Sequence, residues 1–206
     1  MLTLIRREIQ DNLVYALAPC AVSAMAIGCM IYASFSGVEA AAIIYPPLLL
    51  LASFVGFSSL GAAQMYGDRA NRISPLLSTL AVTRNRIFAA RVLVGILAVL
   101  LATMPVVATA VILLRMFALP LEFYRRMVVE ISITAVLMGI ACYSIGLLVG
   151  WTTSRAWLIL GNFLLLTLSV SLMGVKGFGP EAMLILLVFI TAVLVRTWHK
   201  FTSASL

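Results

Sequence analysis

Charged residues are scarce in this 206-residue chain, where Asp, Glu, Lys and Arg together make up 10% of the sequence. A soluble domain normally contains about 25% of them. Hydrophobic residues make up 64%, and the mean hydropathy is +1.16. These values exclude a water-soluble globule, which needs a charged surface, and a disordered chain, which needs a low hydrophobicity.

Histidine and cysteine are also rare, with one and three residues respectively. Cys20, Cys29 and Cys142 lie inside apolar runs and have no CxxC or Cys/His spacing. We interpret them as small buried hydrophobic residues, neither disulfide-bonded nor metal-binding. The single histidine, His199, lies in the C-terminal tail, so intramembrane serine hydrolysis with a histidine base is not expected.

The sequence has neither a GxxxxGK[ST] phosphate-binding loop nor clustered carboxylates for metal-assisted phosphotransfer. Ion-coupled transporters keep ionisable groups deep in the membrane. The deepest such residues here, Arg91 and Glu130, are close enough to the end of an apolar run to snorkel to the interface. We therefore expect no enzymatic activity and no cofactor or metal in this chain, and any uphill transport must draw energy from another chain.

Long apolar runs dominate what is present. A bilayer-spanning helix needs about 20 residues, and six runs of suitable length occur at 14–35, 41–65, 87–114, 127–150, 157–174 and 182–195. The last run is short and is expected to continue through Arg196. We expect Pro46, Pro47 and Pro105 to kink their helices or to end a turn.

Before the first run, residues 1–13 carry apolar side chains at helical spacing opposite a charged face, which predicts an amphipathic helix in the membrane interface. The prediction is an all-α polytopic membrane protein, a single transmembrane domain over residues 1–206. It has six transmembrane helices, this N-terminal interfacial helix and a short cytoplasmic helix between the second and third spans.

Basic residues outnumber acidic ones by fourteen to seven, and their placement between the runs indicates the positive-inside rule rather than nucleic-acid binding. With the N-terminus inside, ten basic residues lie on the cytoplasmic side and four on the outer side. The loop from Arg115 to Arg126 argues the other way, because it places three arginines outside. We expect a multi-pass protein of the plasma (inner) membrane with both termini in the cytoplasm and lipid as a partner.

The connection at 66–86 is the longest polar one and is predicted to be cytoplasmic. Ser74 and Pro75 form a helix-start signal, a side-chain cap followed by a proline. Leu76, Leu77 and Leu80 then give a short helix an apolar stripe. Such a helix fits either a groove on a soluble partner or the lipid interface, and residue chemistry alone leaves both open.

This connection resembles the signature loop of ABC-2 type permeases, the membrane subunits of a class of ATP-binding-cassette exporters. That family typically has an acidic–basic pair after the second span, a leucine-rich coupling helix and a turn into the third span. Ala81 stands where the family usually has proline, and Gln64 lies near a common glutamate. The matching residues are Asp68 and Arg69 for the pair, Leu76, Leu77 and Leu80 for the helix, and Val82, Thr83 and Arg84 for the turn.

The resemblance implies a homodimer, or a heterodimer with a second permease, on two ABC ATPase subunits that bind ATP and Mg. It assigns the ATPase coupling to Asp68, Arg69, Ser74, Pro75, Leu76, Leu77, Leu80 and Arg84. It also implies a substrate path between the second and fifth spans, where Phe54, Phe57, Asn162 and Phe163 are the candidates. Packing or lipid contact explains Phe54 and Phe57 as well, and an interhelical hydrogen bond explains Asn162.

Gly146 and Gly150 form a GxxxG pattern, with Gly139 one heptad earlier. Small residues allow close helix approach, either within one subunit or at a dimer seam.

Two other functions compete with the exporter permease: a membrane-embedded substrate-binding module of a multi-subunit transporter, and a membrane assembly factor.

Overall fold

The computed structural model describes residues 13–36, 39–70, 84–116, 121–150, 159–161, 163–164, 167–168, 171 and 179–203. Five long helices lie in these ranges, and no strand is found among the described residues. The helices are α2 (Leu13–Ser36), α3 (Glu39–Ala70), α5 (Arg84–Met116), α6 (Leu121–Val149) and α8 (Pro180–Ser203).

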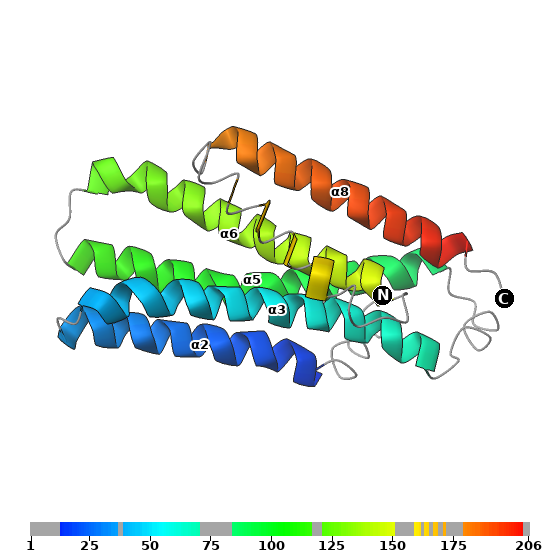
Figure 1. Cartoon of the computed structure of the whole chain (residues 1–206), viewed down its shortest axis with the longest axis horizontal. Helices are drawn as coiled ribbons and strands as arrows, with labels where there is room; N and C mark the ends of the chain where they lie inside the picture. The colour runs from blue at the N-terminus through cyan, green and yellow to red at the C-terminus, as the bar shows by residue number, and fades with distance from the viewer. Residues whose placement is uncertain are drawn as a thin grey trace.

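The five helices run side by side along the long axis of the molecule (Figure 1). Helix α3 packs mainly against α2 and α6, α6 packs against α8, and α5 contacts α2 and α6. The C-terminal ends of α3, α6 and α8 lie at the same end of the bundle as the N-terminal ends of α2 and α5 (Figure 1). Chain direction therefore alternates between α2 and α3 and again between α5 and α6.

Four helical segments among the described residues are long and apolar enough to cross a membrane: Tyr15–Phe35, Asn85–Leu113, Val128–Val149 and Pro180–Thr202. Long apolar helices suit a bilayer because a helix satisfies its own backbone hydrogen bonds where no water is present. The chain is thus an all-helical, multi-pass membrane protein, as its composition predicts.

The helix bounds refine several expectations. Helix α8 continues past Arg196 to Ser203, which confirms the predicted extension of the last apolar run. Helix α3 is continuous through Pro46 and Pro47, and α5 through Pro105, so none of these prolines ends a helix. The predicted interfacial helix lies outside the described residues, apart from Leu13, the first residue of α2.

The interior of the bundle is built mainly from α3, α5 and α6. Phe57, Leu60, Val99, Tyr143 and Leu147 are fully buried there. Leucine and isoleucine side chains on the outer faces are exposed, which suits contact with lipid tails rather than with water. The fold thus has a packed centre and an apolar exterior.

Glycines bring the backbones of α3 and α6 into direct contact. A Cβ atom built on Gly146 would overlap the carbonyl oxygen of Ser58, and one on Gly61 would overlap that of Tyr143. A Cβ on Gly150 would lie 2.7 Å from the Cβ of Met65. All three glycines singled out in the sequence therefore face helices of the same chain: Gly146 and Gly150 face α3, and Gly139 faces Phe57 on α3 and Val99 on α5.

Candidate functional site

A buried polar network joins α3, α5 and α6 near one end of the bundle. The hydroxyl oxygen of Tyr143 on α6 lies 2.7 Å from Oε1 of Gln64 on α3 and 2.9 Å from the carbonyl oxygen of Arg91 on α5. Tyr143 is fully buried, and Gln64 is only 3% exposed. One phenol therefore connects three helices in a place that water does not reach.

The hydroxyl of Tyr143 has a single hydrogen, so it can donate to one of these two acceptors only. With Oε1 facing the phenol, Nε2 of Gln64 has no hydrogen-bond partner among the described residues. The opposite orientation of the amide occupies the same volume. In that orientation Gln64 donates to the phenol oxygen and Tyr143 donates to the Arg91 carbonyl, which satisfies both short contacts.

Gly95 makes room for the tyrosine ring. A Cβ atom at position 95 would overlap the ring of Tyr143. Gly95 lies one helical turn after Arg91, whose carbonyl oxygen is bonded to the hydroxyl of the same tyrosine. The absence of a side chain at residue 95 thus allows the ring to lie flat on α5 and the hydroxyl to reach the backbone.

Arg91 is buried beside this network and is only 4% exposed. Its Nη1 lies 3.8 Å from Sδ of Met65 on α3, and its guanidinium carbon lies 5.9 Å from the ring centroid of Phe201 on α8. The prediction that Arg91 snorkels to the interface is therefore wrong. The side chain turns into the bundle because a sulfur, an aromatic face and neighbouring helices replace water around the cation.

Helix α8 joins the network through its C-terminal end. Phe201 is buried and packs against Phe88 on α5, with 5.7 Å between the ring centroids. A second contact between the same helices is the hydrogen bond of 3.2 Å from Nε1 of Trp198 to Oδ1 of Asn85. The network thus reaches four helices: α3, α5, α6 and α8.

This site lies at the base of the predicted coupling loop. Gln64 and Met65 precede the C-terminal end of α3, and Arg91 lies about 10 Å along α5 from its first residue. Residues 71–83 connect these two helix ends. A displacement of either helix end would therefore act on the contacts made by Tyr143 and Arg91.

The predicted coupling residues are only partly described. Asp68 and Arg69 lie in the last turn of α3, and Arg84 is the first residue of α5, but their side chains lie outside the described part. The remaining coupling residues lie wholly outside the described residues: Ser74, Pro75, Leu76, Leu77 and Leu80.

The predicted substrate-path residues that the structure describes differ in exposure. Phe54 and Phe57 belong to the buried core, and Phe57 lies against Gly139. Phe163 is 70% exposed, and Asn162 lies outside the described residues. Their role in a path between two copies of the chain stays a prediction.

The sequence argument missed Tyr143, Gly95 and Phe201. A tyrosine within an apolar run is itself a signal, because a buried phenol needs a hydrogen-bond partner. Gln64 and Arg91 offered similar signals, since each is a polar residue near a span end. Nothing in the sequence pairs Gly95 with Tyr143.

No group of three or more His, Cys, Asp or Glu residues in the described part of the chain is placed to hold a metal ion. Comparison with protein-family models, with curated proteins and with solved structures finds no match to this chain. The functional argument therefore depends on the sequence and on the geometry of this bundle.

Proposed function

We propose that this chain is the transmembrane permease subunit of an ABC transporter, an exporter of the ABC-2 type, with ATP hydrolysed by a separate subunit. The loop at 71–83, between α3 and α5, would receive the ATPase. The observation that carries the proposal is the network at the base of that loop, in which Tyr143 contacts Gln64 at 2.7 Å and the Arg91 carbonyl at 2.9 Å.

The network suits a coupling role because it connects both ends of the loop to the rest of the bundle. Gln64 and Met65 precede the loop, Arg91 follows it, and Tyr143 and Phe201 belong to α6 and α8. Movement of the loop by a partner would be transmitted through packed side chains to four helices at once. A loop that only contacts lipid headgroups would not require a buried network between its two helix ends and the rest of the bundle.

The chain direction supports the six-span layout that the proposal requires. Helix α6 ends at Val149, and α8 begins at Pro180 at the opposite end of the bundle (Figure 1). The proposal assigns one further crossing of the bundle to the segment between them. With α2, α3, α5, α6 and α8, this crossing would give six spans and would place both termini on the side of the loop.

In the proposed assembly, two copies of the chain, or this chain and a second permease, lie in the plasma membrane above two ATPase subunits. ATP and Mg are bound by those subunits and not by this chain. In this proposal the bundle supplies the conduit.

Purification of the tagged full-length chain from its native membrane in mild detergent tests the proposal. We expect an ABC ATPase to co-purify, and the triple variant Leu76→Asp, Leu77→Asp, Leu80→Asp to lose it, because three charges replace the apolar stripe. The matched control places the same three charges on neighbouring loop positions, as Ser78→Asp, Thr79→Asp, Ala81→Asp.

Retention of the ATPase by the leucine variant would contradict the coupling assignment, as would equal loss in the control. If no ATPase is recovered with the unmodified chain, the permease proposal fails.

A second measurement addresses the network. Tyr143→Phe should keep the ATPase bound but change the ATP hydrolysis rate of the complex relative to that of the free ATPase.

A further inference from the structure

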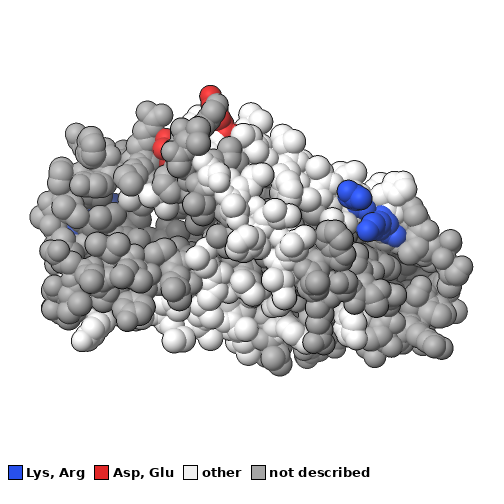
Figure 2. Space-filling view, in the orientation of Figure 1, with Lys and Arg blue, Asp and Glu red and all other residues white. Residues whose placement is uncertain are grey.

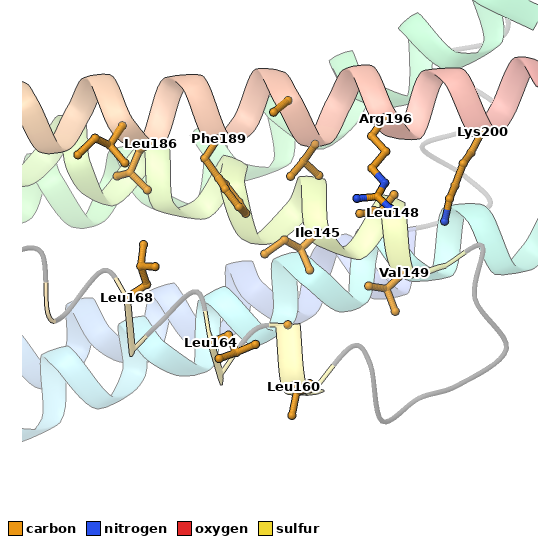
Figure 3. Close-up of a pocket in the computed structure, with 14 residues that line it drawn as sticks. Ile145, Leu148, Val149, Leu160, Leu164, Leu168, Leu186, Phe189, Arg196 and Lys200 are labelled. Atoms are coloured by element: carbon orange, nitrogen blue, oxygen red, sulfur yellow. The ribbon is translucent and has the colours of Figure 1, made fainter.

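An apolar groove opens between α6, the described residues of 159–168 and the part of α8 from Ile185 to Lys200 (Figure 3). Its volume is about 630 Å³, within the range of about 300–1,000 Å³ that is typical of small-molecule sites. Leu148 on α6, Leu164 on the facing segment and Phe189 on α8 are among the apolar lining residues. The groove lies outside the polar network around Tyr143.

Every lining residue except Arg196 and Lys200 is apolar. These two cations lie four residues apart on α8, one turn of the same helix face, and both extend toward the groove (Figure 3). Both are exposed, and no acidic residue of the described part lines the groove. The site therefore combines an apolar groove with two positive charges at one end, and none of its lining residues is acidic.

On this face of the molecule, the basic side chains lie apart from the acidic ones. Figure 2 shows a basic cluster toward one end of the molecule and acidic side chains well apart from it, with uncharged described residues between them. Glu181 lies in the first turn of α8, about 22 Å from Arg196 at 1.5 Å per residue. At that distance Glu181 cannot form an ion pair with Arg196 or Lys200.

The length of the groove matches one leaflet of a bilayer. From Ile185 to Lys200, α8 rises by about 22 Å. Half of a bilayer, headgroups included, is about 20–22 Å thick. The apolar lining then lies at the depth of acyl chains, and Arg196 and Lys200 lie at the depth of headgroups.

We propose that this groove binds an anionic phospholipid of the leaflet at the C-terminal end of α8. Arg196 would contact the headgroup phosphate through its guanidinium fork, and Lys200 would add a second positive charge. One acyl chain would lie between α6 and α8 against Leu148 and Phe189. The inference goes beyond the proposed transport function and does not rest on it, because the site lies within one chain.

Native mass spectrometry of the full-length chain in a neutral detergent tests this, after addition of phosphatidylglycerol or phosphatidylcholine. We expect retained phosphatidylglycerol at one molecule per chain and little phosphatidylcholine. The double variant Arg196→Gln, Lys200→Gln should bind phosphatidylglycerol about 30-fold more weakly, the combined effect of two surface cations. The charge-matched control is Arg86→Gln, Arg115→Gln, whose residues are exposed and do not line the groove.

A second pair of variants tests the groove itself. Ala192→Phe fills the groove without changing its charge, and Val195→Phe adds the same bulk on α8 outside the lining. Only Ala192→Phe should lose the lipid. The elution profile of each variant on size-exclusion chromatography in lipid-free detergent checks folding. If Ala192→Phe does not elute as a folded species, Leu168→Trp, on the opposite wall of the groove, is used in its place.

Several results would overturn the proposal. Equal retention of both lipids, unchanged by any variant, would mean ordinary boundary lipid. Loss in the charge variant but not on filling the groove would mean a headgroup patch only. Competition by millimolar inorganic phosphate would mean a free-phosphate site. A dimer of the chain that dissociates on Ala192→Phe would mean that a second copy occupies the groove.

Discussion

The ring of Tyr143 on α6 lies on Gly95 of α5 so closely that a Cβ atom at residue 95 would overlap it. The hydroxyl of the same tyrosine reaches the carbonyl oxygen of Arg91, one turn earlier on α5, and the side chain of Gln64 on α3. The ring of Tyr143 thus takes this position because residue 95 is a glycine. Its hydroxyl group then connects α3, α5 and α6.

Replacement of Gly95 by alanine should destabilise the chain by about 1–3 kcal/mol, the usual effect of overpacking. The added methyl group must displace the ring of Tyr143, which has no free space because it is fully buried. Thermal unfolding of the purified chain in detergent measures the change. Gly28→Ala on α2 is the control, because a Cβ there meets nothing within 4 Å, and it should be neutral or slightly stabilising.

Removal of the hydroxyl group in Tyr143→Phe keeps the ring but leaves the buried Gln64 amide without its contact. We expect a loss of about 1 kcal/mol, which lies within the range measured for hydrogen bonds between membrane helices. The same unfolding measurement applies, with Tyr32→Phe as the control because Tyr32 is 68% exposed. An equal effect of the two substitutions would show that the network does not stabilise the bundle.

A methyl group at Gly146 should be more damaging than one at Gly95. Its Cβ would overlap the backbone carbonyl oxygen of Ser58, which cannot rotate away as a side chain can. Helices α3 and α6 would have to separate, and we expect a loss of folded protein on size-exclusion chromatography in detergent. If Gly146→Ala instead keeps the stability of the chain and lowers its dimer fraction, the glycines serve a seam between copies.

Phe201 near the C-terminal end of α8 should contribute to stability despite its position. Its ring packs against Phe88 and lies 5.9 Å from the guanidinium carbon of Arg91. Phe201→Ala should lower the unfolding free energy by about 3 kcal/mol, at the low end for a buried phenylalanine. Phe35→Ala, at a position that is 69% exposed, should have little effect in the same thermal unfolding measurement and serves as the control.

Arg91 illustrates what the sequence left undecided. A cation about 10 Å from a helix end can reach the membrane interface or turn into the protein, because its side chain is long enough for both. Local spacing does not distinguish these outcomes. Met65 and Phe201, which decide between them, lie 26 and 110 residues away along the chain.

The sequence alone determined the class of the protein and the position of most helices. Scarce charge and apolar runs of membrane length require helices that satisfy their own backbone in lipid, and this requirement holds for each run separately. The tertiary structure decided which faces meet: Gly146 against Ser58, Tyr143 on Gly95, and Arg91 beside Phe201. In a chain that is apolar all round, hydrophobicity cannot select these faces, so close packing and a few buried polar groups do.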